Sequence, residues 1–326
     1  MNSTEASKEA QQRYWLISTP RTASTMLVKI LNLDEQGVRK AMNGGYFFLP
    51  SIRTRFTLHA KPATEWTDED KKNLNETMQQ CFDNLQDYLK NAEAQKQHIF
   101  VKEHALLVAH PLHENEFVFG AGAAGGEIKS MFQTGSRSEH NKTVHTDEFL
   151  KTWKPTFVIR HPAMIFSSMY RMSRMEAFSF TGGEPHQIQA TLHWARCLYN
   201  FYEDYYKEDS QWPLVLDADD VMQHPEIVAK YARLAGLNPD NLLFSWGKMS
   251  QEELDKISKM EQSAQSFLYS SNKVDLSKVA GDIDIDAEAV KWKEEFGEKH
   301  GANLERLVRA NLDDYEYMRA RRLTLD

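Results

Sequence analysis

An apolar run near the N-terminus leads directly into a short loop of small hydroxylated residues, and this junction constrains the fold more than any other feature. Tyr14–Thr19 is typical of a buried strand, Pro20–Thr25 of a tight loop, and Met26–Leu33 of an amphipathic helix. The first N–H groups of such a helix lack partners within the helix, and the helix dipole places partial positive charge there. Strand, loop and helix together therefore predict an anion-binding site.

The side chains of the loop favour the same interpretation. Arg21 contributes a fixed positive charge, and Ser24 and Thr25 contribute hydroxyl donors. A plain helix N-cap is the alternative, because Ser and Thr are favoured at helix starts for structural reasons alone. The loop lacks the G-x-x-x-x-G-K-[ST] pattern, which disfavours a kinase or another nucleoside triphosphatase.

Short apolar runs alternate with helical patterns along the chain, and this alternation predicts an α/β fold with a central parallel sheet flanked by helices. We expect further strands at Ile99–Lys102, Thr156–Arg160 and Pro213–Asp217. We expect helices at Ala23–Leu33, Asp68–Lys90, Met164–Met175 and Gln187–Tyr206, and in a helical C-terminal part at Glu226–Ala235, Ala287–Glu298 and Leu304–Arg322.

Three stretches interrupt the alternation and are interpreted as lids or binding loops. They are Asn43–Ala63, Phe119–Gly126 and Lys273–Asp286. No linker divides the chain, so we expect a single domain over residues 1–326, with a core at 13–240 and a helical extension and lid at 241–326.

Composition excludes several classes of function. The net charge of −8 and the absence of a long basic run disfavour a nucleic-acid partner. Two cysteines are too few for a disulfide framework and suit a reducing compartment. The polar N-terminus is unlike a signal peptide, and no stretch approaches the roughly 20 apolar residues of a membrane span, so we expect a cytoplasmic protein without a membrane partner.

A second strand-to-helix junction lies mid-chain. The run Thr156–Arg160 is followed by His161-Pro162 and a helical pattern that carries Ser168. Proline is common at the first position of a helix for structural reasons. An arginine at the carboxyl end of a parallel strand is more informative, because ligands bind at that edge and a guanidinium can hold a phosphate with two hydrogen bonds.

At this point the sequence resembles the P-loop sulfotransferase family that uses 3'-phosphoadenosine 5'-phosphosulfate (PAPS). That family has a P-[KR]-S-G-T-T loop for the 5'-phosphosulfate, and Pro20–Thr25 stands in its place. It holds the 3'-phosphate with the arginine of R-[ND]-P and a serine eight residues later, which here are Arg160 and Ser168. Its K-x-H strand end, which carries the catalytic histidine, matches Lys102-Glu103-His104. The three motifs occur in the family's order, and the similarity spans about residues 14–240.

The resemblance implies a function and the residues that perform it. The chain is expected to transfer a sulfuryl group from PAPS, as co-substrate, to a small hydroxylated acceptor without a metal ion. His104 would be the general base, with Lys102 and Arg21 stabilising charge. The resemblance implies that the nucleotide is bound by Arg21, Thr22, Ala23, Ser24, Thr25, Arg160 and Ser168. For His104 the structural alternative is a hydrogen-bonded core histidine.

The acceptor, the donor and the class of protein stay open. Tyr46, Phe47, Phe48 and Phe178 lie in loops where they are candidate contacts for an apolar acceptor, although core packing explains each equally well. Ala23, Met26 and Ala218 replace a glycine, an aromatic residue and a tyrosine of the family pattern. They motivate a sulfotransferase-like enzyme of divergent chemistry, such as elimination or cyclisation on a secondary metabolite.

A non-catalytic nucleotide-binding protein is a third alternative, which Lys102 and His104 argue against. The spacing of His98, His110, His113 and Glu114 fits no zinc pattern. The sequence does not determine the oligomeric state, and a homodimer stays open.

Overall fold

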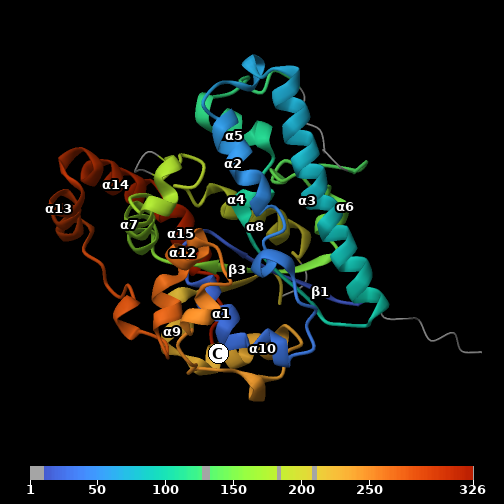
Figure 1. Cartoon of the computed structure of the whole chain (residues 1–326), viewed down its shortest axis with the longest axis vertical. Coiled ribbons are helices and arrows are strands. Elements are labelled where there is room, and N and C mark those ends of the chain that lie inside the picture. The colour runs from blue at the N-terminus through green and yellow to red at the C-terminus, as the bar shows by residue number, and fades with distance from the viewer. Residues whose placement is uncertain (1–10, 127–132, 182–184, 208–210, 326) are drawn as a thin grey trace, which may run out of the picture.

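The centre of the molecule is a four-stranded sheet with the order β2-β1-β3-β4, in which every neighbouring pair is parallel. The computed structural model describes residues 11–126, 133–181, 185–207 and 211–325. The strands are β1 Arg13–Ser18, β2 Ile99–His104, β3 Trp153–Ile159 and β4 Leu214–Asp217. All four predicted strands are confirmed, as is the α/β class with a parallel sheet (Figure 1).

Helices surround this sheet and make up most of the C-terminal part, as predicted (Figure 1). Before the last strand they are α1 Ser24–Leu31, α2 Ile52–Leu58, α3 Asp68–Ala94, α4 Ala105–Val108, α5 Pro111–Phe119, α6 Asp147–Leu150, α7 Pro162–Ser173 and α8 His193–Tyr205. After it they are α9 Ala218–Gln223, α10 Pro225–Leu234, α11 Gln251–Leu254, α12 Lys259–Ser270, α13 Ile285–Phe296, α14 Glu298–Ala310 and α15 Leu312–Arg319.

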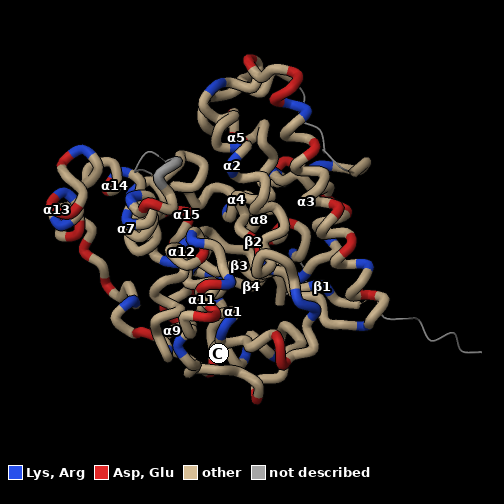
Figure 2. Tube along the Cα trace, viewed as in Figure 1, with Lys and Arg blue, Asp and Glu red and all other residues tan. Residues whose placement is uncertain are grey.

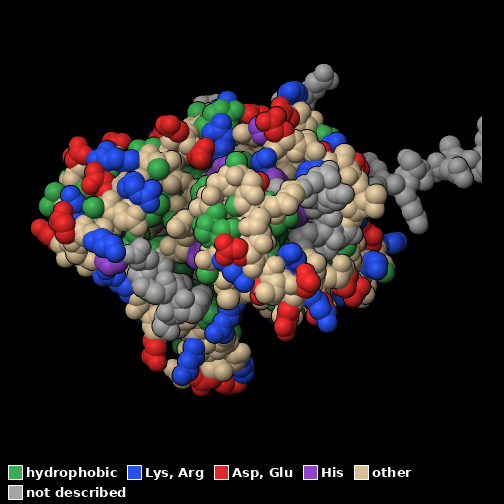
Figure 3. Space-filling view, turned by 90° about the horizontal axis from the view of Figure 1, so that it is seen from above, with side chains coloured by type: hydrophobic (Ala, Val, Ile, Leu, Met, Phe, Trp, Pro, Cys, Tyr) green, Lys and Arg blue, Asp and Glu red, His purple; other side chains and the backbone are tan. Residues whose placement is uncertain are grey.

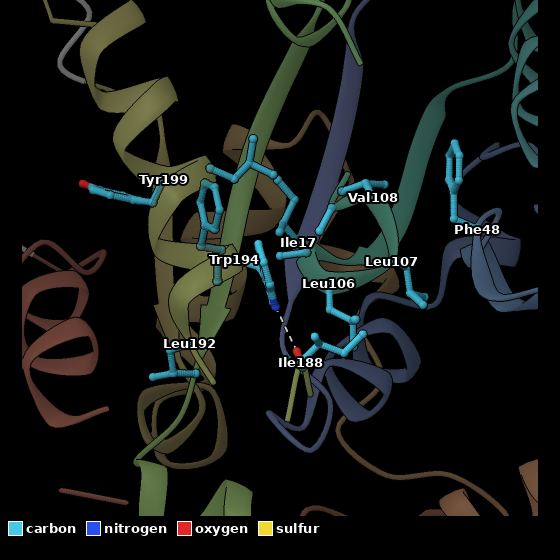
Figure 4. Close-up of a cluster of buried hydrophobic side chains, with 14 of the residues drawn as sticks. Ile17, Phe48, Leu106, Leu107, Val108, Ile188, Leu192, Trp194 and Tyr199 are labelled. Carbon is cyan, nitrogen blue, oxygen red and sulfur yellow. Dashed lines mark hydrogen bonds between the residues drawn. The ribbon is translucent and has the colours of Figure 1, made fainter. Parts of the chain in front are cut away.

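Two hydrophobic clusters, one on each face of the sheet, make the arrangement three-layered. Successive residues of β1 alternate between them, with Leu16 in the cluster under α1 and α10, and Ile17 in the cluster under α3, α7 and α8. The strands are buried on both faces, which explains why they are almost continuously apolar. Figure 4 shows part of the larger cluster, where Trp194 of α8 donates a hydrogen bond from Nε1 to the carbonyl of Ile188 at 2.8 Å.

The register of the sheet brings the carboxyl ends of the strands to one edge. Ser18, the last residue of β1, lies opposite His104 on β2 and opposite Val158 on β3. Ile159 lies in turn opposite Asp217, the last residue of β4. Residues that follow β1, β2, β3 and β4 therefore gather at the same edge, where ligands of open parallel sheets bind.

Some predicted boundaries differ from the structure. The predicted loop Asn43–Ala63 contains α2, which is short and rich in Arg and Thr and so lacks a clear apolar periodicity. The single helix expected at Leu304–Arg322 is broken at Asn311, whose side-chain oxygen accepts a 2.6 Å hydrogen bond from the N–H of Leu192. The apolar periodicity of the sequence does not reveal such a hydrogen bond to a distant segment, and so it does not predict the break in the helix.

Charges of both signs are interspersed over the molecule. Figure 2 shows Lys and Arg scattered among Asp and Glu along the trace, and Figure 3 shows both signs around a face whose centre carries hydrophobic side chains. Within the described residues, no helix is both long enough and apolar enough to cross a membrane. The same residues contain no group of three or more His, Cys, Asp or Glu side chains that could hold a metal ion.

Candidate functional site

The loop between β1 and α1 adopts a strained backbone conformation directly before the N-terminus of the helix. Arg21 and Ala23 both have positive φ angles, of 70° and 62°. Ala23 thus occupies the left-handed region where a glycine would cost less, and α1 begins directly after it. Thr22 stabilises the turn by donating from Oγ1 to the carbonyl of Thr19 at 2.9 Å. Backbone strain that persists in this way is typical of functional sites.

Side chains from the end of β2 meet this loop on the α1 face of the sheet. Lys102 donates from Nζ to Oγ1 of Thr25 at 2.6 Å. The Nδ1 atom of His104 lies 2.8 Å from Oγ of Ser18, whose hydroxyl donates to Oγ of Ser24 at 3.2 Å. The predicted lysine and histidine are therefore brought together with the predicted loop, and a hydroxyl fixes the orientation of the imidazole.

The junction between β3 and α7 contacts the loop between β1 and α1 through two arginine side chains. Arg21 donates from Nε to Oγ of Ser168 at 2.9 Å, and Arg160 donates from Nη1 to the carbonyl of Arg21 at 3.1 Å. Arg160 is 9% exposed, and its Nε is buried without a partner among the described residues. A buried guanidinium donor without a partner is costly, so this atom is available to a ligand.

Burial governs the ionisation of the groups around the imidazole. The pKa of His104 is lowered to about 3 by burial and then by the charges of Lys102 and Arg21, so the ring is neutral at physiological pH. Burial also lowers the pKa of Lys102 to about 7 and raises that of Glu103 to about 8. An anion bound next to Lys102 would raise the pKa of that lysine again, because it stabilises the ammonium form.

Segments of the C-terminal part cover this edge of the sheet. Arg21 donates from Nη1 to the carbonyl of Ala264 at 2.6 Å, and Gln265 of α12 donates to Oγ1 of Thr25 at 3.2 Å. Arg160 donates from Nη2 to the carbonyl of Lys278 at 2.6 Å. Two backbone carbonyls thus accept hydrogen bonds from the same arginine donors that an anion would use.

The four predicted substrate contacts are placed differently from one another. Tyr46 is half-buried and lies against His104, with ring centroids 4.6 Å apart. Phe47 and Phe48 are each 1% exposed and pack in the core, on Tyr88 and His145 respectively. Phe178 is buried in a turn that lies against α12. A substrate-binding role stays a prediction for all four, and only Tyr46 reaches the residues described above.

Several residues of this arrangement were missed by sequence reasoning. Ser18 was counted only as part of a strand, and Glu103 only as the spacer of the K-x-H motif. Gln265 and the carbonyls of Ala264 and Lys278 carry no sequence signal, because their roles depend on contacts with residues far along the chain. A polar residue at the end of an otherwise apolar strand was the one available signal, and it applied to Ser18.

The histidines considered for a metal site lie outside this arrangement. The rings of His110 and His113 are 5.9 Å apart, but no group of three possible metal ligands occurs among the described residues. His98 precedes β2 at the opposite edge of the sheet and stacks on Tyr14 at 5.0 Å. Glu114 is fully buried in an ion pair with Arg55 and a 2.9 Å contact with Nε2 of His59. The carboxylate therefore has a structural role between α2 and α5.

Comparisons with known proteins confirm the resemblance to sulfotransferases. No family model matches the chain. Sulfotransferase ppzF of Metarhizium majus (strain ARSEF 297) is 40% identical over 331 residues, which cover 96% of this chain and 97% of that protein. Sulfotransferase ppzF of Metarhizium rileyi (strain RCEF 4871) is 39% identical over 329 residues, with the same coverage.

Two solved structures are similar at low identity. The sulfotransferase domain from the Synechococcus PCC 7002 olefin synthase is 11% identical with a TM-score of 0.40, and the alignment covers 91% of this chain and 95% of that one. The sulfotransferase domain from the curacin biosynthetic pathway is 13% identical with a TM-score of 0.37, covering 92% and 97%.

Proposed function

The chain belongs to the sulfotransferase family, and from this premise we propose that it transfers a sulfuryl group from PAPS to a hydroxyl group of a small molecule. One observation carries the proposal. The ends of β1, β2 and β3 bring an anion-binding loop, a lysine with a neutral histidine, and a buried arginine to one edge of the sheet. A donor with two separate anionic groups needs such an arrangement, with the base between them.

His104 is proposed as the general base. Its Nδ1 is occupied by Ser18, so Nε2 is the nitrogen that takes the proton of the acceptor hydroxyl. The acceptor oxygen forms a bond to sulfur while the bond from sulfur to the bridging oxygen of the donor breaks. The electron pair of that bond stays on the 5'-phosphate of the departing 3',5'-adenosine bisphosphate, and the proton stays on His104.

Lys102 and Arg21 are proposed to stabilise the charge that develops in this step. Lys102 already reaches the loop through Thr25, so its ammonium lies beside the expected position of the bridging oxygen. The loop residues Thr22–Thr25 and the N-terminus of α1 would bind the 5'-phosphosulfate. No metal is required, because fixed donors and cations supply the charge stabilisation.

Arg160 and Ser168 are proposed to bind the 3'-phosphate of the donor. The unpartnered Nε of Arg160 supports this role, because a phosphate oxygen would supply the missing acceptor. The carbonyls of Ala264 and Lys278 then have to release the two arginines. Residues 241–326 would thus act as the predicted lid, whose contacts in the free protein are exchanged for contacts with the nucleotide.

Calorimetry with 3',5'-adenosine bisphosphate tests the donor assignment without knowledge of the acceptor. We expect binding in the micromolar range, and a loss of about 100-fold in Arg160→Ala, since a charged bidentate contact is removed from a buried site. Arg171→Ala is the matched control, because Arg171 of α7 forms an exposed ion pair with Glu295 of α13. An absence of binding to the wild-type protein would refute PAPS as the donor and favour the divergent chemistry.

A further inference from the structure

Tyr46 has no role in the function proposed above, yet contacts on both sides of it hold its segment next to β2. Gly45 has a φ of 102°, and a Cβ at that position would approach the backbone N and O of Lys102 to 3.0 Å. Only a glycine allows the segment to lie this close to β2. On the other side of Tyr46, the N–H of Phe48 donates to the buried carboxyl group of Glu103 at 3.1 Å.

The fixed segment places Tyr46 among the groups that surround the reacting centre. Its ring lies 4.6 Å from the imidazole of His104, and Nζ of Lys102 lies over the same ring, 4.6 Å from its centroid. Its hydroxyl is within hydrogen-bonding reach of the side chains of Ser24 and Thr25. One side chain therefore contacts the base, the cation and the anion-binding loop at once.

From this geometry, and resting on the proposed function above, we propose that Tyr46 is a catalytic residue whose hydroxyl donates a hydrogen bond to an oxygen of the sulfuryl group during transfer. The ring lies against the imidazole that would take the proton of the acceptor, and the hydroxyl reaches the side chains of the loop that would bind the phosphosulfate. The sulfuryl group has to pass between these two elements. A hydrogen-bond donor in that place stabilises the negative charge on the equatorial oxygens of the sulfuryl group.

The chemistry of a phenol suits this task. Burial raises the pKa of the Tyr46 hydroxyl above its ordinary value, so the group keeps its proton at neutral pH and can donate it in a hydrogen bond. The proton stays on Tyr46 throughout, and the proton of the acceptor passes to His104. The ring contacts with His104 and Lys102 would be equally possible for phenylalanine, so packing alone leaves the hydroxyl unexplained.

Tyr46→Phe isolates the hydroxyl, because it keeps the ring between His104 and Lys102. Because the acceptor is unidentified, the readout is cleavage of PAPS with water as acceptor, followed by chromatography of the 3',5'-adenosine bisphosphate formed with enzyme in excess over PAPS. We expect the cleavage rate to fall by about 10- to 100-fold, as when one preorganised donor is removed from a developing anion. Affinity for 3',5'-adenosine bisphosphate, which lacks the sulfuryl group, should stay within about 2-fold.

Tyr88→Phe is the control for loss of a buried phenol hydroxyl. Tyr88 packs on Phe47 and donates to the carbonyl of Arg39 at 2.9 Å, away from the loop, so its removal should leave the cleavage rate unchanged. Equal rates in wild type and Tyr46→Phe would overturn this inference alone. A wild-type protein that neither binds 3',5'-adenosine bisphosphate nor accelerates PAPS cleavage would instead contradict the proposed function. A parallel loss of nucleotide affinity in Tyr46→Phe would also overturn the inference, since it would show a binding role.

Discussion

Arg21 and Ser168 are separated by 147 positions in sequence, yet Nε of the arginine donates to Oγ of the serine at 2.9 Å. Each residue belongs to a different strand-to-helix junction, one after β1 and one after β3. The hydrogen bond shows that both junctions face the same space at the carboxyl edge of the sheet. The space between the two junctions would therefore allow a ligand with two anionic groups to contact both of them at once.

Replacement of His104 should stop chemistry without preventing binding of the nucleotide. His104→Asn is expected to lower PAPS-dependent turnover by about 10²- to 10⁴-fold, because a general base contributes that much. Its dissociation constant for 3',5'-adenosine bisphosphate should change by less than about 3-fold, since the imidazole is neutral. His140→Ala, at a side chain that is 42% exposed, is the control. Turnover that survives in His104→Asn would show that another group is the base.

Lys102 should take up a proton when the nucleotide binds. In the free protein its pKa is about 7, so at pH 8 the side chain is mostly neutral. The arriving phosphate raises that pKa and favours the ammonium, whereas phosphate groups with a second pKa of about 6 are already ionised at this pH. Calorimetry in buffers of different ionisation enthalpy measures the uptake directly. We expect it to vanish in Lys102→Met and to persist in Lys29→Met, and uptake that is unchanged in Lys102→Met would contradict this assignment.

Glu103 should make the stability of the protein depend on pH. Its pKa is raised from 4.5 to about 8 by burial, so between these values the folded protein keeps a proton that the unfolded chain has lost. Stability therefore falls as the pH rises through this window. Glu103→Gln lacks the titrating group, so this dependence should be absent in that variant. The free energies of unfolding of wild type and Glu103→Gln are measured with urea at pH 5 and at pH 8.5. The difference between the two proteins should change by at least about 1 kcal/mol between these pH values.

An exposed carboxylate provides the comparison for that measurement. Glu65 lies on the surface, so Glu65→Gln is expected to change the free energy of unfolding by less than about 0.5 kcal/mol at either pH. If the difference between wild type and Glu103→Gln were the same at pH 5 and 8.5, Glu103 would not be the titrating group.

Asp219 should hold the segment that follows α12. Its carboxylate accepts hydrogen bonds from the N–H groups of Ala280 and Gly281 at 3.0 to 3.1 Å, close to the carbonyl of Lys278 that bonds Arg160. In Asp219→Ala, amide hydrogen exchange of residues 276–283 should accelerate by about 10-fold, since charged hydrogen bonds are lost. Asp220→Ala is a matched control, because Asp220 pairs instead with Arg322. Equal exchange in both variants would mean that the carboxylate does not restrain the segment.

The sequence contained enough information to predict the sheet and the three motifs. Runs such as Tyr14–Thr19 and Thr156–Arg160 are short and mostly apolar, as strands buried on both faces are, and their alternation with helical patterns indicates a parallel sheet. Because parallel strands end at one edge, the positions of Lys102 and Arg160 relative to the first loop followed from the topology. The roles of these residues stay predictions until the experiments above are done.

The remaining parts of the site depend on packing between distant segments. Phe47 and Phe48 share the loop of Tyr46 and its aromatic character, yet they pack in the core while Tyr46 faces the imidazole. The difference arises from the approach of Gly45 to β2 and from the hydrogen bond between Phe48 and Glu103. Such contacts leave no periodic pattern in the sequence, and the same holds for the carbonyls of Ala264 and Lys278 that accept hydrogen bonds from the arginines.

A crystal structure with 3',5'-adenosine bisphosphate tests the central claim most directly. The account predicts the 5'-phosphate on the loop of residues 20–25 and the 3'-phosphate on Arg160 and Ser168. Nη1 of Arg21 and Nη2 of Arg160 should then have left the carbonyls of Ala264 and Lys278, with which they bond in the free protein. A nucleotide bound at another place, or one that contacts only one of the two junctions, would contradict the account.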